Sequence, residues 1–371
     1  MCAGSSTRPA PPYPGAGTDV RVLLDVQAFR QRRGGVSRYF TSLLTEYRAD
    51  PGLGVEAVTP FRYVDNDYLL DLDPGRYRRT RLALLPAVER ARRVRSEIVH
   101  HTWYARRFLN VGRGARRITT VHDMIPEVLP AEFGDRNPHL AKREFVAASD
   151  AVLCVSDATR RDLLRVYGAP RAAVFVTPLG VSPRFTPAAP PPEWAPEEYL
   201  LFVGDRWGYK NFPTLVEAVA TLGRRHRRLC LVCVGGTPFD ATETAALARL
   251  GLADRVVRRA VTDAELCGLY AGAVAFVFPS LYEGFGLPIL EAFASGCPAV
   301  VSDTPCFREV ADAAALYFPG RDAAALAATL DRVVGDAHLR GTLRRDGLLR
   351  ARSYTWSRTA RQTAEVYRQI L

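Results

Sequence analysis

Two glutamates flank a glycine-rich loop in the stretch EGFGLPILE, residues 283–291. Glu283 precedes a Gly-Phe-Gly loop (284–286), and Glu291 lies about one turn into a helix that Pro288 is suited to open. Glycines let a ligand approach the backbone, and free N–H groups at a helix start attract anions. Carboxylates accept charge-assisted hydrogen bonds from vicinal hydroxyls. The stretch predicts a site for a ligand with negative charge and hydroxyls, although a helix-dipole charge and a solvated loop acid explain the spacing alone equally well.

A second loop that follows an apolar run, FVGDRWGYKN (202–211), carries Arg206 and Lys210. Lys210 is one of only two lysines in the chain and stands just before a predicted helix. An ammonium beside a helix start suits a phosphate group, and an arginine can add a bidentate contact. These residues predict a phosphate site, with surface charges in a turn as the alternative.

Two loops in the first half also follow predicted strands. RRGGVSRYF places Gly34 and Gly35 before a helix, where a phosphate or sugar can approach their amides, although two glycines without a G-x-G-x-x-G pattern are a weak signal. VHDMIP places His122 and Asp123 after another strand, where the imidazole can donate to a sugar hydroxyl and Asp123 can orient it or contact an acceptor. A buried structural His–Asp pair is the alternative. The histidines at 100–101 allow either acceptor contacts or packing.

Short apolar runs alternate with helical segments in both halves, which is typical of parallel sheets covered on both faces. The runs predicted to contain strands are 20–26, 97–102, 116–123, 152–157, 199–205, 229–236, 255–261, 273–280 and 298–303. Ligands bind at the carboxyl ends of such strands, so two such domains would face a common cleft. The proline-dense segment RFTPAAPPPEWAPEE predicts a linker. The predicted units are a disordered leader at 1–18, an N-terminal Rossmann-like acceptor domain at 19–183, the linker at 184–198, a C-terminal Rossmann-like domain at 199–354 and a final helix at 355–371.

Composition narrows the class of protein. The 371 residues are 48% hydrophobic, and the net charge of +11 comes mostly from arginines in residues 1–190, which suits an anionic acceptor or a membrane surface. No apolar run approaches the ~20 residues of a membrane span. The seven cysteines are scattered, and Cys230 and Cys233 lie inside an apolar run, which predicts reduced thiols in the cytoplasm rather than a zinc or redox site. The arginines do not interleave with aromatic residues, so we expect no nucleic-acid partner.

Taken together, these motifs resemble the retaining glycosyltransferases of family 4, which have the GT-B fold. The resemblance covers about residues 20–371 and rests on several motifs in the family's order: GGVSRYF, VHDMIP, VSDATRRDL, TPLGVSPRF, FVGDRWGYKN, EGFGLPILE, GCPAVVSD, FREVADAAALYF and TWSRTARQTAEVY. The two glutamates eight positions apart, with Gly-Phe-Gly between them, are specific to retaining GT-B enzymes. The resemblance implies two Rossmann-like domains that face a cleft, with a C-terminal helix that crosses back to the first domain.

The resemblance also implies roles for single residues in binding a nucleoside diphosphate sugar. Glu291 would hold the ribose hydroxyls, and Glu283 would contact the sugar near the reacting face. The remaining implied contacts are the sugar for His122, the diphosphate for Gly34, Gly35 and Lys210, and backbone contacts to the donor from Gly284, Phe285, Gly286 and Leu287. Asp205 stands where many relatives have an arginine, and Arg206 follows it as the candidate for a second diphosphate contact.

The predicted reaction is the transfer of a hexose-type sugar to a hydroxyl of a saccharide, a lipid-linked glycan or a small natural product. No cofactor or metal is expected, because cationic side chains and helix starts would neutralise the leaving diphosphate. The arginine-rich segment 76–95 suits peripheral contact with the inner face of a membrane, with an ordinary surface helix as the alternative. A nucleotide-sugar epimerase, a phosphorylase and a non-catalytic nucleotide-sugar binding protein are the competing functions. A phosphorylase would need a lysine for pyridoxal phosphate, and the chain offers only Lys142 and Lys210.

Overall fold

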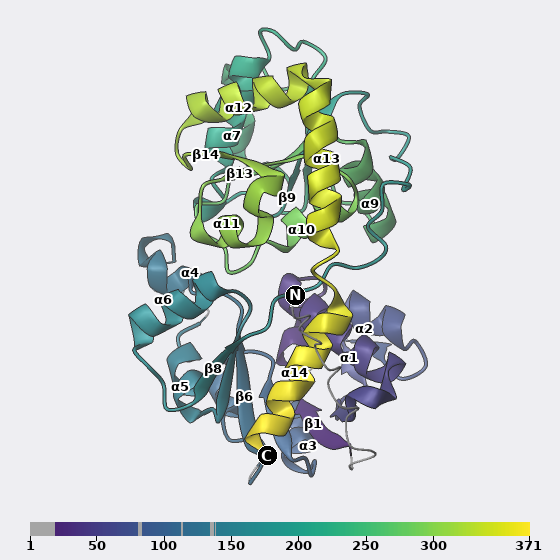
Figure 1. Ribbon diagram of the computed structural model, residues 1–371, viewed down its shortest axis with the longest axis vertical. Helices are drawn as coiled ribbons and strands as arrows, with labels where there is room; N and C mark the ends of the chain where they lie inside the picture. Colours follow the sequence, from purple (N-terminus) through teal and green to yellow (C-terminus); the bar gives the residue numbers. More distant parts are fainter. Residues whose placement is uncertain (1–18, 81–83, 113, 134–136, 138) are drawn as a thin grey trace, which may run out of the picture.

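The computed structural model describes residues 19–80, 84–112, 114–133, 137 and 139–371, with the backbone alone for 84–86; the predicted leader at 1–18 lies outside them. Two six-stranded sheets form two lobes that follow one another along the long axis of the molecule (Figure 1). All strand pairings within both sheets are parallel. The predicted α/β class with two parallel-sheet domains is therefore confirmed.

The first sheet has the strand order β2-β1-β5-β6-β7-β8. Its strands are β1 (Val20–Leu24), β2 (Val55–Val58), β5 (Ile98–His101), β6 (Arg116–Val121), β7 (Ala151–Cys154) and β8 (Ala173–Val176). Every residue of β5 and β7 is buried, as expected for central strands of a parallel sheet covered on both faces. A separate short pair, β3 (Tyr63–Val64) and β4 (Arg78–Arg79), lies outside this sheet.

The second sheet has the order β11-β10-β9-β12-β13-β14. Its strands are β9 (Tyr199–Val203), β10 (Cys230–Val234), β11 (Val256–Arg259), β12 (Ala275–Phe278), β13 (Ala299–Ser302) and β14 (Ala315–Phe318). The chain order reverses between β9 and β12, and in open α/β sheets ligands bind at such a switch point. The loops after β9 and β12, which contain Lys210 and Glu283, start at this point.

Fourteen α-helices are found in the described part of the chain: α1 (Gly35–Ala49), α2 (Asp67–Leu72), α3 (Leu84–Arg92), α4 (Ile125–Val128), α5 (Lys142–Ala148), α6 (Asp157–Tyr167), α7 (Phe212–Leu222), α8 (Ala241–Arg249), α9 (Asp263–Gly272), α10 (Leu287–Ala294), α11 (Pro305–Ala311), α12 (Ala323–Gly335), α13 (Ala337–Ala351) and α14 (Trp356–Ile370). Side chains fix several of their starts. Ser156 caps α6, Asp240 caps α8 and Thr262 caps α9, each by accepting a hydrogen bond from a backbone N–H of the first turn. Residues 184–198, the predicted linker, form neither helix nor strand.

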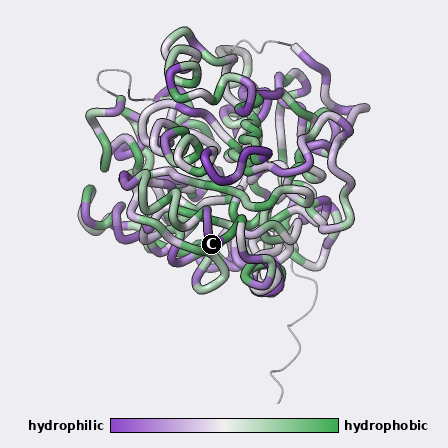
Figure 2. Tube along the Cα trace, turned by 90° about the horizontal axis from the view of Figure 1, so that it is seen from above, coloured by the Kyte–Doolittle hydropathy of each residue, from purple (hydrophilic) through white to green (hydrophobic). Residues whose placement is uncertain are grey.

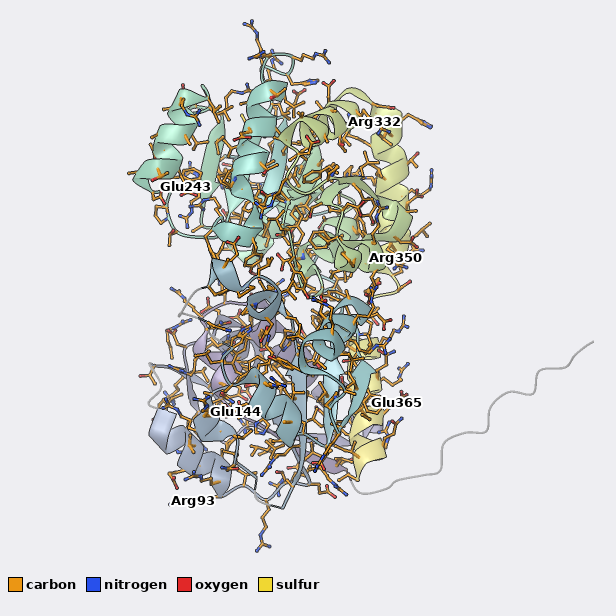
Figure 3. All side chains as sticks on the ribbon, turned by 90° about the vertical axis from the view of Figure 1, so that its left-hand side faces the viewer. Arg93, Glu144, Glu243, Arg332, Arg350 and Glu365 are labelled. Carbon is orange, nitrogen blue, oxygen red and sulfur yellow. The ribbon has the colours of Figure 1, made fainter. Side chains whose placement is uncertain are left out.

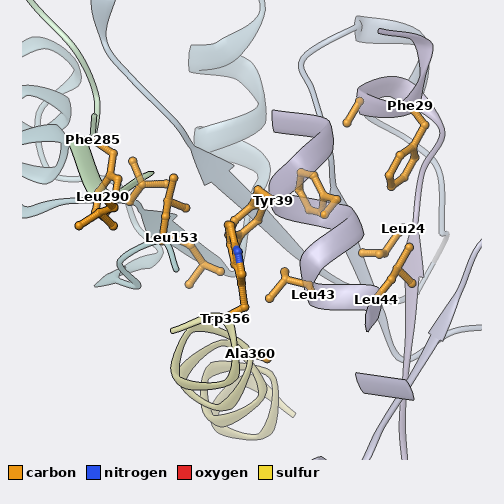
Figure 4. Packing of buried hydrophobic residues seen from close by; sticks show 14 of the residues in the cluster. Leu24, Phe29, Tyr39, Leu43, Leu44, Leu153, Phe285, Leu290, Trp356 and Ala360 are labelled. Carbon is orange, nitrogen blue, oxygen red and sulfur yellow. The ribbon is translucent and has the colours of Figure 1, made fainter. Parts of the chain in front are cut away.

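The C-terminal helix α14 returns to the first lobe, as predicted, and packs beside α1 (Figures 1 and 4). Trp356 is buried there with its ring centroid 6.2 Å from that of Tyr39. The hydroxyl of Tyr367 lies 2.7 Å from Nδ1 of His100, whose Nε2 lies 2.7 Å from Thr120 Oγ1. His100 is therefore buried and held by partners within the protein, in line with the packing interpretation of this histidine.

Hydrophobic stretches run through the interior of the molecule, while hydrophilic stretches lie mainly toward its edge (Figure 2). One buried cluster continues from the first lobe into the second, and Figure 4 shows part of it, with Phe285 and Leu290 near Leu153. The two lobes are thus joined by a shared apolar core as well as by the chain. Among the described residues, no helix is both long and apolar enough to cross a membrane.

Candidate active site

The loop between β12 and α10 forms the centre of the candidate site. Gly286 ends this loop with φ 97° and ψ 46°, a left-handed conformation that residues with a side chain rarely adopt. Pro288 lies in the first turn of α10, where its missing N–H is no loss. The backbone N–H groups of Phe285, Gly286 and Leu287 have no acceptor within the described residues. Together with the positive end of α10 they can bind negative charge or hydroxyl oxygens.

Gly284 joins this loop to the first lobe. Its carbonyl accepts hydrogen bonds from Ser156 Oγ at 2.6 Å and from Thr159 Oγ1 at 2.9 Å, at the start of α6. A Cβ atom at this position would lie 1.7 Å from the carbonyl oxygen of His122. Only glycine therefore fits here, and the contact brings two of the predicted site loops together across the lobes.

Glu283 and Lys210 meet at the switch point of the second sheet. Lys210 ends the 3₁₀ helix η6 (Gly208–Lys210), and its Nζ lies 2.6 Å from Glu283 Oε1. Both side chains are about 15% exposed, at 15% and 14%. Asn211, which sequence reasoning did not single out, ties this loop to the neighbouring one by donating to the carbonyl of Pro279 at 3.0 Å. The ammonium and the carboxylate are thus held side by side at the edge where a charged ligand would bind.

Glu291 lies in α10 with its side chain only 5% exposed. Its Oε2 accepts a hydrogen bond from the Tyr270 hydroxyl at 3.1 Å, and its Oε1 accepts one from the guanidinium of Arg38 in α1. Burial raises the pKa of Glu291, and the charge of Arg38 opposes that rise. Sequence reasoning did not assign a role to Arg38, although it lies in the GGVSRYF motif. The carboxylate predicted to hold a ribose is therefore contacted by a cation from the other lobe.

The glycine pair lies at the start of α1. Gly34 is the N-cap residue in an extended conformation, and a Cβ atom there would meet Gln31 Oε1 at 2.4 Å. A Cβ atom at Gly35 would meet nothing within 4 Å. The approach to the start of α1 at Gly35 is therefore open, which fits the predicted phosphate contact but does not test it.

His122 lies at the end of β6, against the ring of Tyr39 at a centroid distance of 5.1 Å. Burial lowers the pKa of His122 to about 4, so the imidazole is neutral near pH 7. Its Nε2 is buried and has no hydrogen-bond partner in the part of the chain that the structure describes. An unpaired ring nitrogen of a neutral imidazole can donate to or accept from a ligand hydroxyl.

Asp123 contacts a buried cluster that includes His139 and Lys142. Its Oδ1 accepts from the backbone N–H of Ile125 at 3.0 Å and lies 3.6 Å from His139 Nδ1 and 3.7 Å from Lys142 Nζ. Burial opposes ionisation of Asp123, but Lys142 and His139 hold its pKa below the usual value. No hydrogen bond joins it to His122 among the described contacts, so the suggestion that Asp123 orients this imidazole finds no support. Its predicted contact with an acceptor remains a prediction.

Arg206 is occupied by the protein itself. Its Nε lies 2.7 Å from Oε1 of Glu243, and its Nη2 donates to the carbonyl of Thr237 at 2.7 Å; Figure 3 labels Glu243 in α8. The guanidinium also lies over the ring of Phe239, 4.6 Å from its centroid. Arg206 is buried and braces the loop after β10, whereas Lys210 reaches Glu283. A contact with a diphosphate would require Arg206 to exchange these partners.

Metal ligands do not gather at this site. Within the described residues, no group of three or more His, Cys, Asp or Glu side chains is arranged to hold a metal ion. Lys210 and the starts of α1 and α10 remain the groups predicted to contact a diphosphate. The expectation of a metal-free reaction remains a prediction.

Solved structures share this two-lobed fold. Sucrose-phosphate synthase from Thermosynechococcus elongatus superposes with a TM-score of 0.72 at 21% identity, over 95% of this chain and 99% of that chain. Anabaena HepE, solved with UDP and glucose, gives a TM-score of 0.72 at 16% identity, over 93% and 98%. These likenesses define the fold as the two-domain GT-B fold.

Sequence comparisons agree with this class. Residues 33–185 match the family described as Glycosyltransferase Family 4, and residues 197–336 match Glycosyl transferases group 1. The chain is 30% identical over 272 residues to O-antigen chain mannosyltransferase B of Escherichia coli, across 69% of this chain and 71% of that protein. It is 34% identical over 251 residues to D-inositol 3-phosphate glycosyltransferase of Frankia alni, across 62% of each. The chain belongs to glycosyltransferase family 4, as the motifs predicted.

Proposed function

We propose that the protein is a retaining glycosyltransferase that moves a hexose-type sugar from a nucleoside diphosphate sugar to an acceptor hydroxyl without a metal ion. The observation that carries this proposal is the contact of the stretch 283–291, which the two glutamates flank, with two segments of the first lobe. Gly284 packs on His122, and Glu291 pairs with Arg38. Residues far apart in sequence thereby enclose one region that offers amides, carboxylates and an ammonium, which are the groups that a nucleotide sugar requires.

Each group has a part in the proposed reaction. The bond from the anomeric carbon to the diphosphate breaks, and the acceptor oxygen bonds to that carbon on the same face, while its proton passes to an oxygen of the departing diphosphate. Lys210 and the starts of α1 and α10 stabilise the charge that develops on the diphosphate. Glu283 and neutral His122 bind sugar hydroxyls, and Glu291 binds the ribose. Contact between the lobes excludes water that would otherwise hydrolyse the donor.

Donor and acceptor are proposed from the relatives' names and from charge. One relative is named as a mannosyltransferase of an O-antigen chain and another as a D-inositol 3-phosphate glycosyltransferase. A mannosyl donor and a saccharide acceptor are therefore the first pair to assay, with lipid-linked glycans and small natural products as further acceptors. The basic first half suits an enzyme on the inner face of the cytoplasmic membrane, where anionic lipids attract arginine.

The test is nucleoside diphosphate release from a panel of UDP-, GDP- and dTDP-sugars with candidate acceptors, in EDTA and in Mg²⁺. We expect one donor to give acceptor-dependent release that EDTA leaves intact. NMR of the product should show the anomeric configuration of the donor. Donor binding without release would point to a non-catalytic binding protein, and conversion of the nucleotide sugar to an epimer without an acceptor would point to an epimerase. Failure to bind any nucleotide sugar would refute the proposal.

A further inference from the structure

A buried ion pair connects the two lobes at the residue expected to bind the donor ribose. Arg38 in α1 donates to Oε1 of Glu291 in α10, across 253 positions of sequence. The two side chains are 17% and 5% exposed. Such a pair in a region of low dielectric is a strong local interaction whose partners depend on each other.

Each partner also has a contact in its own lobe. Arg38 donates to the Tyr68 hydroxyl at 3.1 Å, and its guanidinium lies 5.1 Å from the centroid of that ring. Glu291 accepts from Tyr270 in α9 at 3.1 Å. If the lobes separate, neither group is left without a hydrogen bond. Opening the pair leaves each group one hydrogen bond to a tyrosine hydroxyl of its own lobe, and Arg38 Nη2 also lies 3.6 Å from Oδ2 of Asp263 in α9.

Space around Glu291 decides what else it can bind. One oxygen faces Arg38, the other faces Tyr270, and the carboxylate is almost fully covered. Beyond Arg38 lies a cavity of about 420 Å³ whose lining includes Tyr68 and Asp263, so the guanidinium has room to withdraw. Two vicinal hydroxyls can reach the carboxylate only if Arg38 gives up its place on Oε1.

We propose that Arg38 is a positioning residue that competes with the donor ribose for Glu291. This inference rests on the proposed function, because it assumes that Glu291 binds ribose. With no nucleotide bound, Arg38 holds Glu291 and keeps the lobes together. When the donor binds, the 2′ and 3′ hydroxyls replace the guanidinium on the carboxylate, and Arg38 retains its contact with Tyr68. Donor affinity is thus lowered by the free energy needed to break the ion pair.

The test compares Arg38→Met with wild type in calorimetric binding of UDP, GDP and their 2′,3′-dideoxy forms. We expect Arg38→Met to bind whichever ribonucleotide the wild type binds about tenfold more tightly, the scale of one charge-assisted hydrogen bond. Affinity for the dideoxy form should stay within about twofold, since it lacks the hydroxyls that Glu291 would accept. Arg48→Met is the matched control, because Arg48 is a half-exposed arginine of the same helix that pairs with Asp73 and not with Glu291.

Unchanged or weaker ribonucleotide binding by Arg38→Met would overturn the proposed competition between Arg38 and the ribose for Glu291. An equal gain for the ribonucleotide and the dideoxy nucleotide would overturn it too, because it would mean that the lobes simply open. Small-angle scattering without nucleotide gives a second readout: Arg38→Met should have a larger radius of gyration than wild type, and an identical radius would overturn the linking role. If wild type binds neither nucleotide, competition for a ribose is overturned, while the panel of nucleotide sugars tests the proposed function separately and scattering still decides the linking role. Arg38→Lys, which keeps the charge but not the planar fork, should give an intermediate gain and replaces the methionine variant if that variant does not fold.

Discussion

At the scale of single residues, the two glutamates of the stretch EGFGLPILE have different surroundings. Glu283 is partly exposed and lies beside Lys210, whereas Glu291 is almost fully buried between Tyr270 and Arg38. The first is placed to contact a group that enters and leaves the cleft. The second is placed to define a fixed anchoring point, because its covered carboxylate accepts only groups that replace an existing partner.

We expect Glu291→Gln to weaken nucleoside diphosphate binding about 10- to 100-fold, because charge-assisted hydrogen bonds to the ribose contribute roughly 1.5–3 kcal/mol. Isothermal titration calorimetry measures this directly. Glu283→Gln is the control: it should keep the diphosphate affinity within about threefold and instead lower turnover, since Glu283 is assigned to the sugar. Equal affinities of both variants and wild type would remove the ribose role from Glu291.

At the scale of the elements, close backbone contacts decide how the strand-end loops meet. Gly284 and Gly180 are the clearest cases. A Cβ atom at Gly180 would lie 2.2 Å from the backbone nitrogen of Trp356, where α14 begins. Both glycines are therefore required by packing between segments that are distant in sequence, which a motif alone does not reveal.

Gly284→Ala should reduce turnover about 100-fold or more, because a Cβ atom 1.7 Å from the His122 carbonyl would force the two site loops apart. The measurement is the rate of nucleoside diphosphate release with donor and acceptor. Gly341→Ala in α13 serves as the control, since a Cβ atom there meets nothing within 4 Å and alanine favours a helix. Full activity of Gly284→Ala would show that the lobes need not approach so closely.

Docking of α14 should depend on pH through His100. Burial, with His101 and His122 nearby, lowers the pKa of His100 from 6.5 to about 3, so below pH 6.5 the unfolded chain binds a proton that the folded protein does not. Its contribution to stability is present above pH 6.5 and falls as the pH drops toward 3. Melting temperatures of wild type should fall over this range more steeply than those of His100→Gln. Equal slopes for wild type and His100→Gln would contradict this prediction.

At the scale of the whole molecule, charge and contact between the lobes govern access to the site. The net charge of +11 falls mainly in the first half of the sequence. Cross-lobe contacts include those at Gly284, the pair of Arg38 with Glu291, the hydrogen bond from Arg33 to the carbonyl of Val261 at 3.1 Å, and Glu309, whose carboxylate accepts from the backbone N–H groups at the start of α6 at 2.7 and 2.8 Å. Separation of the lobes must break all of these contacts.

If the basic half contacts a membrane, the full chain should sediment with vesicles that contain anionic lipid and not with neutral vesicles. Raising the salt from 0.1 M to 1 M should release it, because the Debye length falls from about 10 Å to about 3 Å. Co-sedimentation at several salt concentrations checks this. Binding that neutral lipid supports equally well would contradict an electrostatic contact.

Much of the fold could be predicted because central parallel strands read as continuous apolar runs. The runs at 97–102, 116–123, 229–236 and 273–280 all contain strands of the structure. Five strands were not predicted: β3 and β4 form the separate short pair, and β2, β8 and β14 lie at the edges of the two sheets and are four residues long. A strand at the edge of a sheet is less completely covered than a central strand, so its sequence is a less continuous apolar run and gives a weaker signal for a strand.

The sequence by itself determined which residue types stand at the strand ends. Parallel strands bring their carboxyl ends to one edge, so EGFGLPILE, the Lys210 loop, the glycine pair and VHDMIP could be assigned to one cleft before any coordinates. Only the tertiary structure decided the partners: Arg38 on Glu291, Lys210 beside Glu283, and Arg206 held by Glu243. Local spacing governs how a loop is built, whereas the choice of a charge partner depends on which side chains two separately folded lobes bring into contact.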